Sequence, residues 1–151
     1  DPAYDAFIGE WSVDYVDNDT GAEVTDGFRV TISPDVEGKT FIIDGLAGGA
    51  SNPVVAEFVD NGLRLKAGMN LYPMSETSYA VLGLLTDVSV YVGTYTCIGS
   101  VYDDIITFAG YDMPYEFKGF VFYVYDMQTG EYPGYVEPVV QNPVFRRVAA
   151  Q

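Results

Sequence analysis

The sequence contains no histidine and a single cysteine, Cys97, among its 151 residues. Without histidine the chain can form neither a Ser-His-Asp triad, nor a Cys-His pair, nor a histidine-ligated zinc or copper site. One cysteine excludes an intrachain disulfide and a cysteine-cluster metal site, and such a lone thiol is expected to be a small buried hydrophobe. The chemistry left open is that of carboxylates, calcium binding or no catalysis at all.

Basic residues are also scarce, because 7 Lys and Arg stand against 22 Asp and Glu, a formal net charge of -15. A nucleic-acid-binding protein needs a basic surface to displace counterions, and binding to an anionic membrane surface has the same requirement. No run of 18 apolar residues is present, so no segment is expected to span a membrane. We expect no nucleic-acid partner, no cofactor, no metal site and no catalytic residue.

What the chain does contain is typical of one β-rich domain over residues 1–151. Hydrophobic residues make up 48% and aromatic residues 15%, with 13 Tyr and 9 Phe, which favours β-structure. Turn-forming residues separate short segments rich in Val, Ile, Tyr, Phe and Thr. No long helix is expected, and residues 74–85 are the best candidate for a helical turn or an irregular crossing.

Alternation of apolar and polar residues predicts about eight to nine antiparallel strands, which suit a closed barrel or a sandwich. In the first strand Trp11, Val13 and Tyr15 share one face. The second strand has an inward set of Val24, Phe28, Val30 and Ile32. The expected strands cover residues 10–16, 24–33, 40–46, two strands flanking 61–62, 88–98, 104–110, 117–125 and a short final strand at 144–148.

The strands on either side of Asn61-Gly62 allow a prediction of register. This pair is preferred in two-residue type I′ turns, because both positions require positive φ. Apolar residues then fall on one side and charged partners on the other. The predicted pairs are Asp60 with Leu63, Phe58 with Leu65, Ala56 with Ala67, Val54 with Met69, Glu57 with Lys66 and Val59 with Arg64.

The later strands are apolar on both faces. Residues 117–125 carry Phe120, Phe122 and Val124 on one side and Val121, Tyr123 and Tyr125 on the other. A strand of this kind is covered on both sides, or one side meets a partner or a ligand. The loop at 128–141 contains prolines that make it a poor central strand, so we expect it at a barrel mouth or on an interaction surface.

The motif Gly9-x-Trp11 at the head of the first strand resembles the lipocalin and calycin superfamily. In that superfamily the tryptophan plugs one end of the barrel and an arginine near the last strand stacks on it. Here the tail offers Arg146 and Arg147, of which we favour Arg147 for a cation–π contact with Trp11. The usual Thr-Asp-Tyr turn of lipocalins is missing.

The succession of segments 30–33, 42–46 and 53–60 is similar to the lipocalin-like domains of exported gut-bacterial lipoproteins. The resemblance covers roughly residues 7–72 and the last ten residues. It implies an all-β, antiparallel lipocalin-like barrel that carries a small molecule. It also implies a place in the periplasm or on the cell surface, with a lipidated cysteine upstream of Asp1.

Tyrosines are the strongest candidates for a binding site, because aromatic faces with polar tips suit sugars and mixed apolar ligands. Tyr91, Tyr95, Tyr123 and Tyr125 are the candidate ligand-binding residues. The same set includes Tyr111, Tyr115, Tyr132 and Tyr135. The alternative is that these rings fill the barrel or coat a Tyr-rich surface.

Two sets of acidic residues are candidate sites. Residues 17–21, Asp-Asn-Asp-Thr-Gly, are similar to the start of a calcium loop, but a hairpin loop built on Asx turns is favoured. Asp103, Asp104, Asp112 and Glu116 are candidates for a carboxylate pair of the glycosidase type, with solvated loop charges favoured.

Three hypotheses for function follow. The first is a non-enzymatic binding module that holds a small apolar or amphiphilic ligand in the barrel. The second is a structural or interaction module whose barrel is filled and which acts through a Tyr-rich surface. The third, ranked last, is a glycan binder or a carboxylate-dependent glycan enzyme.

Overall fold

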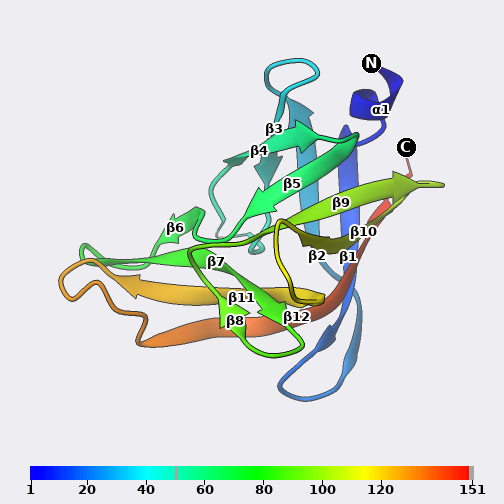
Figure 1. The fold of residues 1–151 in the computed structure, drawn as a ribbon. Helices are drawn as coiled ribbons and strands as arrows, with labels where there is room; N and C mark the ends of the chain where they lie inside the picture. Colours follow the sequence, from blue (N-terminus) through cyan, green and yellow to red (C-terminus); the bar gives the residue numbers. More distant parts are fainter. Residues whose placement is uncertain (50, 150–151) are drawn as a thin grey trace.

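The computed structural model describes residues 1–49 and 51–149 and shows a closed antiparallel barrel whose sheet continues into an extension at one side (Figure 1). The barrel strands neighbour one another in chain order, and pairing of the first with the last closes the ring. This confirms the fold class expected from the sequence. The barrel strands are β1 (Gly9–Asp17), β2 (Glu23–Pro34), β3 (Thr40–Asp44), β4 (Val54–Val59), β5 (Gly62–Lys66), β9 (Thr96–Tyr102), β10 (Ile105–Tyr111) and β12 (Gly134–Arg147).

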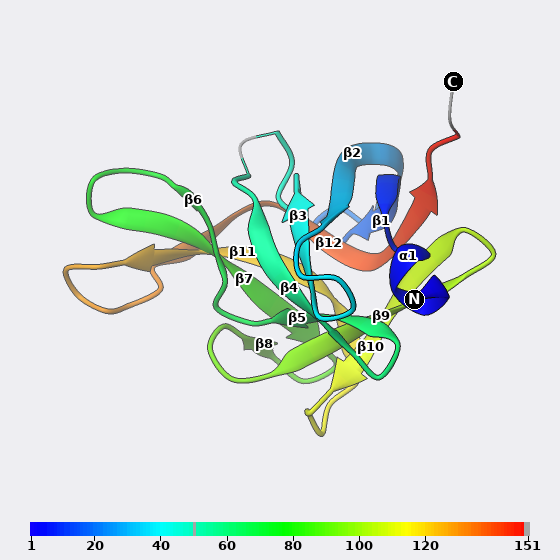
Figure 2. The ribbon, with the colours of Figure 1, turned by 90° about the horizontal axis from the view of Figure 1, so that it is seen from above.

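Two insertions between barrel strands build this extension, which we call the side sheet. Strands β6 (Asn70–Pro73), β7 (Ser78–Thr86) and β8 (Val90–Tyr91) come between β5 and β9, and β11 (Phe117–Asp126) comes between β10 and β12. In the side sheet β7 lies between β6 and β11, and β11 pairs with β12. Figures 1 and 2 both show this sheet extending to one side of the barrel.

The long strand β12 belongs to both the barrel and the side sheet. Its residues 134–141 pair with β11, whereas its residues 144–146 pair with β10. Asn142 adopts a φ of 50° between the two regions. The other edge of β12 pairs with β1 from Trp11 to Asp17. One strand therefore closes the barrel and anchors the side sheet.

A single cluster of buried apolar residues joins the two parts. The faces predicted for β1 and β2 are confirmed, since Trp11 pairs with Val30 and Val13 with Phe28. Aromatic contacts hold the barrel end near α1 (Pro2–Asp5), where the Tyr4 and Phe41 rings stack with centroids 4.4 Å apart. The side sheet contributes its inner face to the same core through Ala80, Leu82, Leu84, Phe120, Phe122 and Val140.

The predicted register of the β4–β5 hairpin is wrong by two residues. Phe58 pairs with Leu63 and Glu57 with Arg64, so the turn residues are Asp60 and Asn61, both with positive φ. Gly62 instead lies in β5, where an added Cβ would be 2.5 Å from the Ile98 side chain. The glycine thus permits close packing against β9. A shift of two preserves the side of each residue, and Glu57 still binds Lys66 at 2.7 Å.

Three other predicted segments differ from the structure. Residues 74–85 form a turn and most of β7 rather than a helical turn, and 88–98 split into β8, an irregular stretch and the start of β9. The short final strand and part of the preceding loop are one 14-residue strand, β12. Pro138 is accommodated there because the β11–β12 register shifts between Val136 and Val140, which frees Pro138 from the ladder.

Candidate functional site

Trp11 and Arg147 meet at the barrel end near α1. The Trp11 side chain is fully buried and its indole Nε1 donates to the Phe7 carbonyl at 3.0 Å. The Arg147 guanidinium carbon lies 4.4 Å from the centroid of the indole ring. Arg146 points elsewhere and pairs with Asp14 at 2.8 Å. Of the two arginines that the sequence left open, Arg147 makes the contact.

Arg147 also holds the chain that leads into β1. Its two terminal nitrogens donate to the carbonyls of Ala6 and Ile8, each at 2.7 Å, and its Nε donates to Asp104 at 2.7 Å. A Cβ at Gly9 would lie 2.6 Å from the guanidinium, and Gly9 has a φ of 141°. The glycine of the Gly9-x-Trp11 motif is therefore the residue that leaves room for Arg147.

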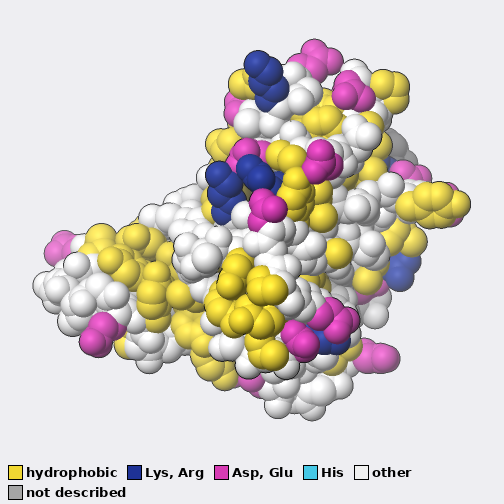
Figure 3. Space-filling view, in the orientation of Figure 1, with side chains coloured by type: hydrophobic (Ala, Val, Ile, Leu, Met, Phe, Trp, Pro, Cys, Tyr) yellow, Lys and Arg dark blue, Asp and Glu magenta, His cyan; other side chains and the backbone are white. Residues whose placement is uncertain are grey.

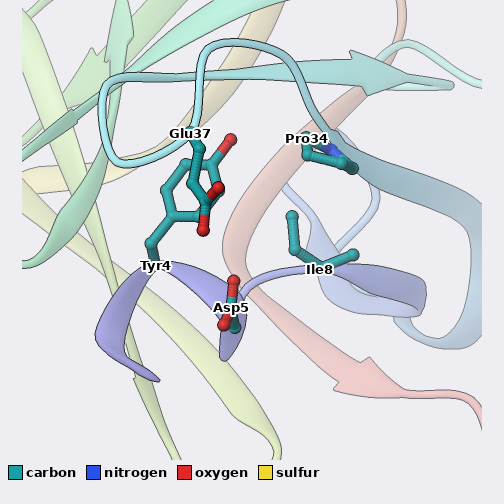
Figure 4. Close-up of a pocket in the computed structure, with 5 residues that line it drawn as sticks. All are labelled: Tyr4, Asp5, Ile8, Pro34 and Glu37. Atoms are coloured by element: carbon teal, nitrogen blue, oxygen red, sulfur yellow. The ribbon is translucent and has the colours of Figure 1, made fainter. Parts of the chain in front are cut away.

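An open depression of about 360 Å³ lies beside this end, between α1 and the end of β2 (Figure 4). Its apolar side is formed by the ring of Tyr4, whose hydroxyl donates to the Thr40 carbonyl at 2.6 Å. The carboxylates that border it belong to exposed side chains. None of the four candidate ligand-binding tyrosines lines it. The lining residues are Tyr4, Asp5, Ile8, Pro34 and Glu37.

The structure divides those four tyrosines between two clusters. Tyr123 and Tyr125 lie on β11, in the side sheet, and not on a barrel strand. Tyr91 lies on β8 and Tyr95 just before β9. They do not form one site inside the barrel, because the insertions that carry most of them build the side sheet.

The larger cluster covers the outer face of the side sheet. Its rings form a continuous chain, with centroid separations of 5.2 Å for Tyr79–Tyr125, 5.2 Å for Tyr125–Tyr132, 6.4 Å for Tyr132–Tyr123 and 6.1 Å for Tyr123–Tyr135. We call these five residues the tyrosine face. They come from β7, β11, the loop after β11 and β12.

Alternation along the strands explains why the tyrosines share one face. Tyr123 pairs with Val81 on β7 and with Tyr135 on β12, and directly paired residues point to the same side of a sheet. Their neighbours Phe120 and Phe122 point to the core. Val81 and Val121 are buried on this face, outside the main core cluster.

The rim of the tyrosine face is acidic. The Tyr135 hydroxyl donates to the Asp19 carboxylate at 3.3 Å, and Glu137 lies two residues further along β12. The charge of Asp19, together with partial burial, raises the pKa of Tyr135. Tyr132 and Tyr135 remain 40% and 48% exposed. The surface therefore combines accessible rings with negative charge.

The second cluster consists of Tyr91, Tyr95 and Tyr115. The rings of Tyr91 and Tyr115 are stacked with centroids 5.1 Å apart, and Tyr95 lies nearly perpendicular to both. Hydrogen bonding to Tyr115 and burial raise the pKa of Tyr91 to about 12. The three rings pack against one another, and Tyr95 also packs against the core. This cluster therefore presents less free ring surface than the tyrosine face.

No family model, curated protein or solved structure matches the chain. The resemblance to lipocalin-like domains thus remains a prediction from the sequence. Among the described residues, no helix is long and apolar enough to cross a membrane.

The candidate carboxylates lie apart. Asp103 and Asp104 form the β9–β10 turn, whereas Asp112 and Glu116 follow the far end of β10. The seven residues of β10 separate the two groups by about 20 Å. Asp104, Asp112 and Glu116 each pair with a basic side chain. The four do not converge on one cleft.

Residues 17–21 form the loop of the β1–β2 hairpin. The Asp17 side chain accepts from the Asp19 amide at 2.9 Å, which is an Asx turn. Within residues 1–49 and 51–149, no three His, Cys, Asp or Glu side chains gather as a metal site would require. Cys97 is buried in the core, and burial raises its pKa, so its thiolate is disfavoured.

Sequence reasoning missed one member of the tyrosine face and the grouping of the rest. Tyr79 lies in the segment that the sequence predicts to be irregular, so its pairing with Tyr125 could not be predicted. The sequence pattern predicts a loop for the segment that contains Tyr132 and Tyr135. The second apolar face of residues 117–125 is the signal that could have grouped these tyrosines, because such a face needs other side chains to cover it.

Proposed function

We propose that this chain is a non-enzymatic interaction module whose binding surface is the tyrosine face. The observation that carries the proposal is the continuous chain of five tyrosine rings on the outer side of the side sheet. Tyrosine supplies a large contact area at a low cost in conformational entropy, and its hydroxyl adds a polar contact. A partner that covers these rings would bury the exposed parts of Tyr132 and Tyr135, which are 40% and 48% exposed.

The packing of the barrel favours this surface over the interior as the binding site. Inward side chains such as Val13, Phe41 and Leu65 are fully buried and belong to the contiguous core. The tyrosines expected to grip a ligand lie largely in the side sheet. The separation of the acidic groups favours binding without catalysis. An exported, lipid-anchored location in the bacterial cell envelope is part of the proposal on the strength of the resemblance alone.

The proposal is tested by binding of the whole chain to an immobilised panel of basic, acidic and neutral peptides and neutral oligosaccharides. We expect at least one class to be retained by the wild type and lost by the double variant Tyr132→Ala/Tyr135→Ala. Both side chains are substantially exposed, so the fold should survive, as circular dichroism would verify. Tyr102→Ala is the matched control, because Tyr102 is 85% exposed at the β9–β10 turn beside Asp103.

Binding that the double variant and the control retain equally would contradict the proposal. Native mass spectrometry tests the carrier hypothesis in parallel. A small molecule that co-purifies with wild type and double variant alike, with no class retained on the panel, would favour a ligand in the barrel.

A further inference from the structure

Two arginine sites inside the same molecule indicate the chemical class of a partner that would fit the tyrosine face. Arg147 stacks on Trp11 and binds Asp104. Arg64 lies with its guanidinium carbon 5.7 Å from the Tyr111 ring centroid and donates to Glu57 at 2.7 Å. In each case one guanidinium group lies over an aromatic ring and also forms an ion pair with a carboxylate.

The Arg64 site shows the same elements that the tyrosine face carries. The Tyr111 hydroxyl donates to Asp60, as the Tyr135 hydroxyl donates to Asp19. The carboxylate hydrogen bond raises the pKa of Tyr111, and the charge of Asp19 raises that of Tyr135. At both places a tyrosine hydroxyl donates to a carboxylate, and beside Tyr111 the chain itself supplies the cation, Arg64, which is bound to Glu57.

The side sheet supplies no such cation. Between Lys66 and Arg146 the sequence contains one basic residue, Lys118. Lys118 lies near the start of β11, at the opposite end from Tyr125, and pairs with Glu116 at 3.3 Å. In the view of Figure 3 the part of the side sheet that projects to the left shows no Lys or Arg side chain.

We propose that the tyrosine face binds an arginine-bearing basic segment of a partner protein, a step that rests on the proposed function. Its guanidinium groups would stack on Tyr132 and Tyr135 and pair with the bordering carboxylates. Arginine suits this surface better than lysine, because its planar group stacks on rings and pairs with carboxylates in a fixed fork. The net charge of -15 would also attract a basic segment and repel an anionic one.

The test measures binding of the whole chain to a short peptide that alternates arginine and glycine. The same peptide with citrulline in place of arginine keeps the shape and removes the charge, and a lysine version keeps the charge and removes the fork. We expect the arginine peptide to bind best. The double variant Tyr132→Ala/Tyr135→Ala should bind it about tenfold more weakly, as the loss of two cation–π contacts would give.

A charge control separates the tyrosine face from general attraction by an acidic protein. Glu137→Gln should weaken binding of the arginine peptide, whereas Glu37→Gln removes the same charge at the β2–β3 connection and should leave binding unchanged. Equal weakening by the two variants would overturn the proposal, as would equal binding of the arginine and citrulline peptides.

Different binding results contradict the proposed binding surface and the proposed basic partner. If an oligosaccharide or a neutral peptide binds and the double variant abolishes this binding, the tyrosine face is the binding surface but its partner is not basic. If the arginine peptide binds the double variant and the wild type alike, the tyrosine face is not the surface at all. Binding of the arginine peptide that is about tenfold weaker in the double variant and unchanged in Tyr102→Ala supports both proposals.

Discussion

At the scale of single residues, Arg147 has the largest set of contacts among the basic side chains. It stacks on Trp11, donates to two backbone carbonyls before β1 and pairs with Asp104. Its neighbour Arg146 is 53% exposed and makes one ion pair, with Asp14. Substitution of Arg147 therefore removes several interactions, whereas substitution of the adjacent Arg146 removes one ion pair.

We expect Arg147→Leu to lower the free energy of unfolding by about 3 kcal/mol, because the Ala6 and Ile8 carbonyls lose their donor and Trp11 loses its cation. Arg146→Leu should cost less than about 1 kcal/mol, as is usual for an exposed ion pair. Urea denaturation of both variants measures the difference. Similar losses in the two would contradict the importance of the Trp11 contact.

Part of this residue-scale detail could be predicted from the sequence. The Gly9-x-Trp11 motif and the tail arginines are short local patterns, and they pointed to the contact that the structure shows. Gly62 could not be read in this way. It follows an asparagine and so resembles a turn residue, whereas its reason for being glycine is the approach of Ile98 from β9. That approach depends on a strand more than thirty residues away.

At the scale of elements, the contact between β11 and β12 is unusually close. A Cβ at Gly119 would lie only 1.9 Å from the Val140 carbonyl oxygen and 2.9 Å from the Gln141 Cα. Both are backbone atoms, which cannot swing aside as a side chain can. Glycine at this position is what allows the side sheet to join the strand that closes the barrel.

Gly119→Ala should therefore destabilise the protein by about 3 kcal/mol, since β11 and β12 would have to separate. Gly134→Ala, in the same pair of strands, should change stability by less than about 0.5 kcal/mol, because nothing lies within 4 Å of the added Cβ. Thermal unfolding of the two variants distinguishes them. An unchanged stability of Gly119→Ala would contradict the close approach of Gly119 to the backbone of Val140 and Gln141.

The strands were easier to predict than their partners. Alternation placed β1 and β2 correctly and showed that β11 is apolar on both faces. It could not show that β7 and β11 leave the barrel, because a side chain pattern gives the face of a strand and not its neighbour. The length of β12 was missed for a related reason, since Pro138 argues against a strand unless the register shift beside it is known.

At the scale of the whole molecule, negative charge acts on the folded state. The chain carries 22 acidic against 7 basic residues. Arg29 makes ion pairs with both Asp26 and Glu10, and Glu57 binds both Arg64 and Lys66. Most carboxylates nevertheless face an excess of like charge, and self-repulsion of this kind weakens a compact state.

Added sodium chloride should stabilise the protein, because it screens this repulsion over distances beyond about 10 Å. A gain of about 1 kcal/mol would raise the Tm by about 2–4 °C in a chain of this size. Scanning calorimetry across a salt series measures the effect. The variant Glu23→Gln/Glu76→Gln carries two fewer negative charges and should respond less, and a Tm that falls with salt would show that the ion pairs dominate.

The double membership of β12 also bears on how the molecule is assembled during synthesis. Among the described residues β12 is the last strand, and until it has been synthesised β1, β10 and β11 each have an unpaired edge. The barrel and the tyrosine face are therefore completed by the same strand, and neither is finished before the other.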